Sequence, residues 1–271
     1  MCSHAADTVA GPAVSKVGVT SRKGHDMDEQ RDLEGLSALV TGATSGIGQA
    51  AAEELGRRGA EVIVHGRDGA RGAAVAGAIT SAGGKARFVA ADLSDPAQLA
   101  DLVEQAGAVD ILVNNAGISL PAGPTADVDV ATFDRIFAAN VRAPYFLVAA
   151  LAPEMAARGS GSIINIGSQA GHVGMPGIAA YSGTKGALAS LTRSWAAEFS
   201  PAGVRVNVVA AGPVYTPIQP RESAEAVGAG TIMGRVAQPD EIASVIAFLA
   251  SPKASYITGA VIAADGGRTA I

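Results

Sequence analysis

The chain has 271 residues with a formal net charge of −5, 48% hydrophobic residues and 17% charged residues. This balance excludes a wholly disordered chain, and the negative charge disfavours a general nucleic-acid-binding surface. A chain of this size can bury a core without a metal or a disulfide staple, and Cys2 is its single cysteine. We therefore expect no metal site, no nucleic-acid partner and a reducing compartment, for which we take the cytoplasm.

Residues 1–32 are expected to form a disordered tail ahead of the globular part. Charged residues are scattered among small ones there, without the apolar core of a secretory signal. A transit peptide, or a true start at Met27, are the alternatives. We find no run of 18 or more apolar residues, so we expect no membrane partner.

After Gly35, short apolar runs alternate with longer amphipathic stretches. We expect the long helical region within 130–158 to be bent by Pro144, or to have a second segment start there. Ser94 or Asp95 should cap the third helix. In chain order the pattern predicts a strand over 36–41, a helix over 47–58, a strand over 61–65, a helix over 68–81, a strand over 86–90, a helix over 96–105, a strand over 110–114, the long helical region, a strand over 162–167, a helix over 179–200, a strand over 204–210, a helix over 240–250 and a strand over 260–264.

The strands are rich in Val, Ile and Ala without alternation, which indicates a sheet that is covered on both faces. The regular strand–helix order favours parallel strands joined by right-handed crossovers. The fold class is therefore α/β: a single-domain, Rossmann-like, doubly wound fold over residues 33–271 with a seven-stranded parallel sheet. Ligands bind such sheets at the carboxyl ends of the strands, so the loops after the first, fourth, fifth and sixth strands should hold the chemistry.

The first strand leads directly into the glycine-rich segment TGATSGIG at 41–48. Glycines at these positions let the backbone approach a phosphate pair, and the helix that follows offers free N–H groups and a positive dipole end. A tight turn without a ligand is the alternative for this motif taken alone.

Further motifs follow in order: Asn114-Asn115-Ala116-Gly117, then Ser168, then Tyr181-Ser182-Gly183-Thr184-Lys185. Together with TGATSGIG they resemble the short-chain dehydrogenase/reductase family, over about residues 33–271. The resemblance implies an NAD(P)-dependent oxidoreductase that interconverts a ketone and a secondary alcohol by hydride transfer.

Two other activities remain open. One is a 3-oxoacyl-carrier-protein reductase, although such enzymes tend to carry a basic residue where this chain has Ala197, just before Glu198. The other is a non-catalytic dinucleotide-binding protein, which would typically lack Tyr181 or Lys185.

The resemblance also implies a set of cofactor-binding residues. Asp92 would flank the adenine, or would merely hydrogen-bond its own loop. Family members usually have Pro-Gly where this chain has Ala211-Gly212. The implied set is Thr41, Gly42, Ser45, Gly46, Ile47, Gly48, Asp92, Leu93, Asn114, Ala116, Gly117, Tyr181, Lys185, Gly212, Pro213, Val214 and Thr216.

The loop after the second strand should choose between NAD and NADP. An acid there would hold the ribose 2′-hydroxyl and repel a 2′-phosphate, but Gly66 occupies that position and Arg67 follows it. A guanidinium can clamp a phosphate with two hydrogen bonds, so we predict NADP(H) rather than NAD(H). Asp68 could neutralise Arg67, and Arg71 is either a second phosphate ligand or a solvated charge.

Four residues are expected to carry the chemistry. Lys185 lies four residues after Tyr181, on the same helical face. A free tyrosine has a pKa near 10; we expect the ammonium and an oxidised nicotinamide to lower it, as a general acid/base requires. The resemblance implies that Tyr181 exchanges the proton, Ser168 holds the substrate oxygen, Lys185 holds ribose hydroxyls and Asn140 anchors a relay water. Alternatively, Asn140 bridges a helix kink.

The segment 214–234 should form a lid over a mostly apolar substrate pocket, and ketones, polyols and polyketide-like molecules all fit it. His172 is either a substrate contact or a surface residue. The resemblance further implies a homo-oligomer, a tetramer or a dimer, built by pairing the helix over 179–200 and its neighbour. Trp195 on that helix should pack at the interface or in the core.

Overall fold

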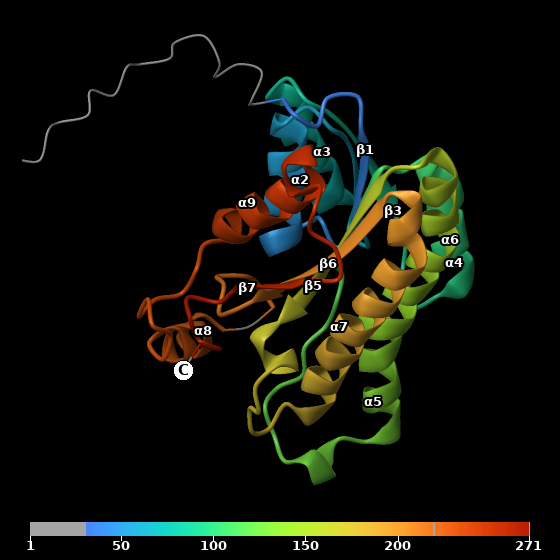
Figure 1. The fold of residues 1–271 in the computed structure, drawn as a ribbon. Coiled ribbons are helices and arrows are strands. Elements are labelled where there is room, and N and C mark those ends of the chain that lie inside the picture. Colours follow the sequence, from blue (N-terminus) through green and yellow to red (C-terminus); the bar gives the residue numbers. More distant parts are fainter. Residues whose placement is uncertain (1–30, 219, 271) are drawn as a thin grey trace, which may run out of the picture.

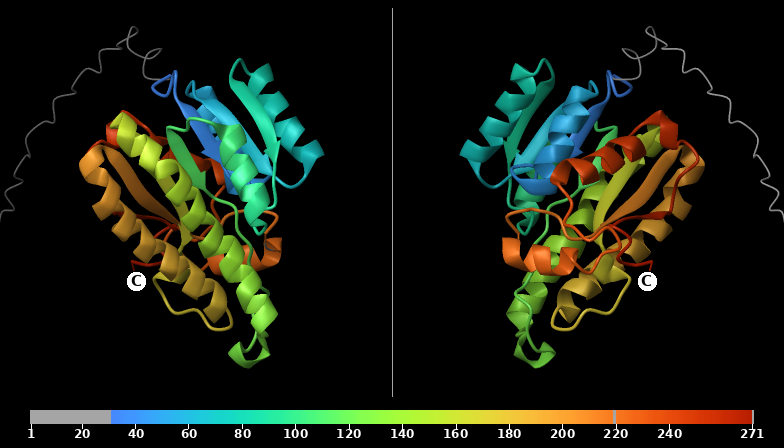
Figure 2. Two further views of the ribbon diagram at one scale, coloured as in Figure 1. Left: turned by 90° about the vertical axis from the view of Figure 1, so that its right-hand side faces the viewer. Right: turned by 90° about the vertical axis from the view of Figure 1, so that its left-hand side faces the viewer.

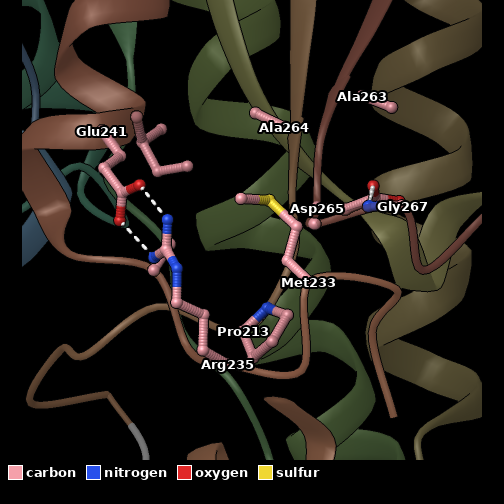
Figure 3. Close-up of a pocket in the computed structure, with 11 residues that line it drawn as sticks. Pro213, Met233, Arg235, Glu241, Ala263, Ala264, Asp265 and Gly267 are labelled. Atoms are coloured by element: carbon pink, nitrogen blue, oxygen red, sulfur yellow. Dashed lines mark hydrogen bonds and ion pairs between the residues drawn. The ribbon is translucent and has the colours of Figure 1, made fainter. Parts of the chain in front are cut away.

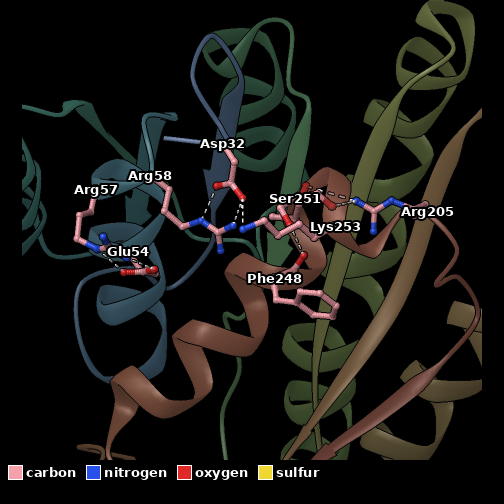
Figure 4. A network of polar contacts seen from close by, with 9 residues as sticks. Asp32, Glu54, Arg57, Arg58, Arg205, Phe248, Ser251 and Lys253 are labelled. Carbon is pink, nitrogen blue, oxygen red and sulfur yellow. Dashed lines mark hydrogen bonds and ion pairs between the residues drawn. The ribbon is translucent and has the colours of Figure 1, made fainter. Parts of the chain in front are cut away.

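The computed structural model describes residues 31–218 and 220–270. Residues 1–30 of the expected tail lie outside this part. The last two tail residues do not behave as a tail: Asp32 pairs with Arg58 at the end of the first helix, and Lys253 approaches its carboxylate to 3.9 Å. Figure 4 shows this cluster, which ties the start of the described chain to two distant segments.

The core of the fold is one seven-stranded sheet in the order β3-β2-β1-β4-β5-β6-β7, with every pair parallel. This confirms the predicted Rossmann-like α/β class. The strands are β1 (Ser37–Val40), β2 (Glu61–Gly66), β3 (Lys85–Ala90), β4 (Ile111–Asn114), β5 (Gly161–Ser168), β6 (Val204–Ala211) and β7 (Val261–Ala264).

Helices cover both faces of the sheet (Figures 1 and 2). Ala38 and Val40 of β1 belong to the core under α2, α3 and α9, whereas Leu39 between them belongs to the core under α4, α6 and α7. Successive strand residues thus face opposite layers and both are buried, which explains the unalternated apolar runs. The helices are α2 (Gly46–Arg57), α3 (Gly69–Ser81), α4 (Pro96–Ala106), α5 (Val130–Phe137), α6 (Ala143–Arg158), α7 (Ala179–Phe199), α8 (Arg221–Gly228) and α9 (Pro239–Ala250).

The ends of the predicted strands and helices agree with the structure to within one residue, apart from the long helical region. That region is interrupted by a π-helical turn, Ala138–Arg142, which separates α5 from α6. Pro144 stands in the first turn of α6, so a second segment begins there, as one of the two alternatives had it. Asp95, not Ser94, caps α4.

By length and composition, Val130–Arg158 could cross a membrane, which the sequence analysis did not anticipate. In this fold its buried side chains, among them Leu147 and Leu151, belong to the core against β4 and β5. We therefore interpret this region as a helical layer whose buried side packs on the sheet.

Helix α8 was not predicted within the lid segment. It has eight residues, follows Pro220 without a side-chain cap, and buries only Ala224 and Gly228. So short a helix leaves little periodic signal in the sequence.

Two glycines of α3 provide a matched test of the packing between α3 and β3. A Cβ on Gly72 would lie 2.1 Å from atoms of the Phe88 ring, whereas a Cβ on the exposed Gly77 would meet nothing within 4 Å. We expect Gly72→Ala to lower the free energy of unfolding by about 1–3 kcal/mol through overpacking. Gly77→Ala should raise it by about 0.5–1 kcal/mol, because alanine favours the helix. Urea unfolding of both variants measures this; equal effects would contradict the assigned contact.

Candidate active site

The sheet brings the predicted site residues to one edge. Parallel pairing sets Val40 beside Val113, Asn114 beside Asn165, and Ser168 beside Ala211. The carboxyl ends of β1, β4, β5 and β6 therefore lie together, and their loops share one cleft edge.

The glycine-rich loop after β1 packs so closely against its neighbours that only glycine fits at several of its positions. Gly42 and Gly46 have positive φ values of 63° and 55°. A Cβ on Gly42 would lie 2.9 Å from the Cα atom of Ala116, and one on Gly48 would lie 2.3 Å from the carbonyl oxygen of Gly42. Other side chains at these positions would push α2 away from β4.

Thr41 fastens this loop to the end of β4. Its hydroxyl donates to the carbonyl of Val113 and accepts the N–H groups of Asn115 and Ala116, both at 3.0 Å. The Asn115 amide in turn donates to the carbonyls of Thr41 and Gly42. Asn115 was quoted in its motif but not assigned to the site; only the tertiary contact shows what it does.

The loop leaves a run of backbone donors available. Among the described residues, the N–H groups from Thr44 to Gly48 have no hydrogen-bond acceptor, and the Ser45 side chain does not cap α2. Ile47 packs at the edge of the core. Free N–H groups at the positive end of a helix dipole can hold an anionic group such as a pyrophosphate.

Arg67, just after β2, is exposed and forms no ion pair within the described part of the chain. Asp68 instead caps α3 and binds Arg71 at 2.8 Å. The alternative in which Asp68 neutralises Arg67 is therefore wrong, because Arg71 takes that carboxylate.

Gly66 lies against the glycine-rich loop. A Cβ at this position would be 2.4 Å from the Cγ2 atom of Thr44. An acidic side chain, as NAD-binding proteins carry there, would thus collide with Thr44 unless the loop moved.

Asp92 hydrogen-bonds its own loop, as the alternative interpretation expected. Its carboxylate accepts from the backbone N–H and the hydroxyl of Ser94 at 2.9 and 2.8 Å, and these bonds lower its pKa. Leu93 is buried in the core with α4 and α6.

His65 is a buried titratable residue that the sequence analysis passed over. Its Nδ1 atom accepts from the N–H of Gly42 at 3.2 Å, and its Nε2 atom lies 3.1 Å from the carbonyl of Ala91. Burial lowers its pKa to about 4, so the ring is neutral at physiological pH.

Ser168 ends β5, and Tyr181 and Lys185 lie on α7 facing it. Burial raises the pKa of Tyr181, and a hydrogen bond with Ser168 lowers it by less. The Lys185 ammonium lies 5.7 Å from the centre of the tyrosine ring and donates to the carbonyl of Ile166 at 2.8 Å. For the ammonium alone the predicted lowering is wrong, because burial outweighs the distant Lys185 charge. The lowering by an oxidised nicotinamide stays a prediction.

Lys185 itself is buried, and burial lowers its pKa to about 8. The Lys185 side chain is therefore not a solvated surface charge. The Lys185 ammonium lies beside Tyr181 and close to β5. A molecule bound at the strand ends could contact it there.

Asn140 sits in the π turn between α5 and α6 and is 1% exposed. Its side chain accepts from the N–H of Ile118 at 2.8 Å and donates to the carbonyl of the same residue at 2.9 Å. It also donates to Thr184, next to Lys185 in sequence. Asn140 thus both marks the kink and ties the loop after β4 to α7.

Asn114 supports the sheet, as expected. It donates to Asn165 on β5, and Asn165 donates to Thr192 on α7, each at 2.8 Å. Gly117 lies against Asn140, where a Cβ would come within 3.0 Å of the amide oxygen.

The segment after β6 keeps its glycine despite the departure at Ala211. A Cβ on Gly212 would lie 2.6 Å from the Cα atom of Asp265, so only glycine fits. Val214 is buried and bridges to Ala237. Thr216 lies against Gly46 of the glycine-rich loop, since a Cβ on that glycine would be 3.0 Å from its methyl group.

Two hollows flank this segment. One of about 300 Å³ lies between Pro213, Met233 and the chain at Asp265, with the Arg235–Glu241 ion pair at its side (Figure 3). The other, of about 200 Å³, lies between Tyr215, Thr216 and α8. His172 is exposed.

Comparison with known proteins is consistent with this geometry. A family model described as enoyl-(acyl carrier protein) reductase matches residues 42–269. A cis-4-hydroxycyclohexanecarboxylate dehydrogenase of Sinomonas cyclohexanicum is 41% identical over 242 residues, which are 86% of this chain and 96% of the relative. The chain belongs to the short-chain dehydrogenase/reductase family.

Solved structures agree with this assignment. One, provisionally described as a β-ketoacyl-ACP reductase, is 52% identical with a TM-score of 0.82, covering 88% of this chain and 100% of that one. Another, provisionally described as an NAD(P)-dependent gluconate 5-dehydrogenase of Beutenbergia cavernae, contains NADP at low occupancy; it is 38% identical with a TM-score of 0.84, covering 89% and 100%.

As a member of the short-chain dehydrogenase/reductase family, the protein is an oxidoreductase that acts on alcohols or ketones with a nicotinamide dinucleotide. The residues at the strand ends fit such a cofactor, because free N–H groups at α2, the exposed Arg67 and the buried Lys185 are donors that can bind anionic or hydroxyl-bearing groups.

The buried imidazole of His65 predicts a pH-dependent stability. Its pKa of about 4 in the folded protein is below the ordinary 6.5, so the unfolded chain takes up the proton first as pH falls. We expect His65 to cost the folded state roughly 2–3 kcal/mol between pH 6.5 and pH 4. Urea unfolding across this range measures the loss, and His65→Asn should flatten it. An unchanged slope in the variant would contradict the assignment.

Proposed function

We propose that the protein reduces a small ketone to a secondary alcohol with NADPH, with Tyr181 as the general acid. The observation that carries the proposal is the position of Tyr181, which lies close enough to Ser168 for that side chain to affect its pKa and has the buried Lys185 ammonium 5.7 Å from its ring centre, at the edge where the strands end. The same residues would run the reverse oxidation.

In this mechanism Ser168 orients the carbonyl oxygen of the substrate by donating its hydroxyl. Tyr181 gives that oxygen its phenolic proton as the carbonyl carbon is reduced. When bound, the nicotinamide supplies the hydride, and its oxidised form adds the positive charge that favours the phenolate.

Lys185 would hold the ribose hydroxyls and keep a cation beside the phenol. Asn140 would anchor the relay water through Ile118, because its side chain hydrogen-bonds both the N–H and the carbonyl of that residue. Lys185 and this water would then supply the proton to Tyr181.

The cofactor would lie across the strand ends, with its pyrophosphate on the free N–H groups at the start of α2. Asp92 and Leu93 would flank the adenine and Val214 and Thr216 the nicotinamide carboxamide. The proposed binding set is Thr41, Gly42, Ser45, Gly46, Ile47, Gly48, Arg67, Asp92, Leu93, Asn114, Ala116, Gly117, Tyr181, Lys185, Gly212, Pro213, Val214 and Thr216.

Three observations support NADP(H) over NAD(H). Arg67 is exposed and forms no ion pair within the described chain, since Asp68 is held by Arg71. Asp92 is the nearby acid: hydrogen bonds from Ser94 and, to a lesser degree, the charge of Arg67 lower the pKa of its carboxyl. Thr44 occupies the space into which an acid at Gly66 would project. A relative of known structure contains NADP.

For the substrate, we propose a small alcohol or ketone, the class named for the Sinomonas relative. A second candidate is a 3-oxoacyl-carrier-protein reductase, which the 52% identical structure favours by its description. The absence of a basic residue at Ala197 weighs against it.

We also propose a cytoplasmic homo-oligomer, a tetramer or a dimer. The predicted pairing uses α7 and its neighbour, and the helices α5 and α6 that contact α7 expose the apolar residues Val130, Phe133, Tyr145 and Phe146, which support an interface on this side of the molecule. Trp195 is 5% exposed within one chain and lies 6.0 Å from Tyr145, so it belongs to the core beneath that surface.

Tyr181→Phe tests the proposed acid. We expect turnover of a ketone with NADPH to fall by at least about 1,000-fold, because the proton donor is lost, while the Kd for NADPH changes by less than about threefold. Tyr256→Phe, at a fully exposed tyrosine, is the matched control and should leave both unchanged. Steady-state kinetics and NADPH fluorescence titration give the two quantities. Retained turnover in Tyr181→Phe would overturn the assignment.

Arg67→Ala tests the cofactor preference. We expect roughly 10- to 150-fold weaker binding of NADPH and little change for NADH, since only the former brings a 2′-phosphate to the guanidinium. Arg71→Ala removes a neighbouring guanidinium that is already paired with Asp68, and should change neither affinity. Equal weakening of both cofactors by Arg67→Ala would contradict the phosphate contact.

A further inference from the structure

His65 is a buried histidine near the end of β2, and its side chain contacts the segments that follow two other strands, β1 and β3. It is 3% exposed. Its neighbours are the loop after β1, through Gly42, and the last residue before the Asp92 loop, Ala91.

The hydrogen bonds fix the state of the ring. The N–H of Gly42 donates to Nδ1, so Nδ1 carries no proton, and Nε2 must therefore donate to the carbonyl of Ala91. Both ring nitrogens are satisfied in a single neutral tautomer. In a protonated ring Nδ1 would also carry a proton, so the Nδ1–H and the N–H of Gly42 would be two donors pointing at each other.

The main chain of His65 adds a third contact to the same loop. Its carbonyl accepts the N–H of Ala43 at 2.8 Å. Gly42 and Ala43 are thus both held by His65, and the run of free N–H groups starts at the next residue, Thr44.

We propose that His65 is a positioning residue for the dinucleotide: it sets the spacing between the glycine-rich loop and the Ala91–Asp92 segment. The inference rests on the proposed cofactor site, in which the loop holds the pyrophosphate and Asp92 flanks the adenine. One dinucleotide must meet both segments at the same time, so a fixed distance between the segments lowers the ordering cost of binding.

The chemistry of the position explains why a histidine serves there. An apolar side chain would leave the half-buried N–H of Gly42 and the buried carbonyl of Ala91 without partners, and an unpaired buried group costs more than the lost bond itself. A permanently charged side chain could not be buried without a partner charge. Neutral imidazole offers one acceptor and one donor on opposite sides of a flat ring.

Three substitutions separate the two contacts. His65→Asn keeps an acceptor near the Nδ1 position for Gly42. His65→Gln keeps a donor near the Nε2 position for Ala91 but leaves the Gly42 N–H unpaired. His65→Leu removes both contacts at similar volume.

We expect the Kd for NADPH, measured by fluorescence titration of the full chain, to rise about tenfold in the Gln and Leu variants and less than about threefold in the Asn variant. The KM for NADPH should follow the Kd, and kcat should stay within about twofold of the wild type, because the reacting residues on β5 and α7 are untouched. Such a split between KM and kcat, with rescue by asparagine, is not expected from a general loss of stability.

Ser251→Ala is the control for stability alone. Ser251 is fully buried after α9 and donates to the carbonyl of Phe248, next to the Arg205 contacts at the start of β6 (Figure 4). It should lower the melting temperature without changing the Kd for NADPH.

The proposal is overturned if all three His65 variants bind NADPH as the wild type does. It is also overturned if Ser251→Ala and the His65 variants all lose NADPH affinity in the same proportion to their loss of melting temperature. A wild-type protein that binds neither NADPH nor NADH would instead overturn the proposed function, so the two failures are distinguishable.

Discussion

The close contact between the glycine-rich loop and the end of β4 is the constraint on which the rest of the site depends. Gly42 and Gly48 leave no room for a Cβ, and Thr41 and Asn115 close the contact with hydrogen bonds. Because this contact uses the carbonyls of the loop, its N–H groups beyond Ala43 stay free. The same packing that lets α2 begin beside the sheet thus leaves the run of free N–H donors from Thr44 to Gly48 at this place.

A second layer of buried amides and hydroxyls links these donors to the reacting residues. Asn114, Asn165 and Thr192 connect β4 through β5 to α7, and Asn140 connects Ile118 to the turn before Lys185. Each of these buried groups would be costly if left unpaired. The network therefore holds the proposed cofactor side and the proposed proton-transfer side of the site in one register, while burial raises the pKa of Tyr181.

Much of this could be predicted from the sequence, for physical reasons. Runs such as 62–64 are apolar on every residue because both faces of the strand are covered, and the ends of such strands are set by glycine, proline and capping residues that act locally. The motif order placed Ser168, Tyr181 and Lys185 at a common edge, because parallel strands present their carboxyl ends together. Helix α8 was missed because eight residues with two buried side chains give no clear period.

The sequence by itself determined the family, the sheet and the identity of the proposed reacting groups, since these depend on local pattern and on motif order. Tertiary structure decided the contacts between segments far apart in the chain. In the folded chain Asp68 pairs with Arg71, Arg67 stays exposed, and Thr44 packs against Gly66. Burial raises the pKa of Tyr181, whereas the nearby ammonium had suggested a lower pKa. The tertiary structure also gave His65 its two partners, which lie 23 and 26 residues away in sequence. Burial and hydrogen-bond direction are properties of the packed molecule, so no local pattern could have supplied them.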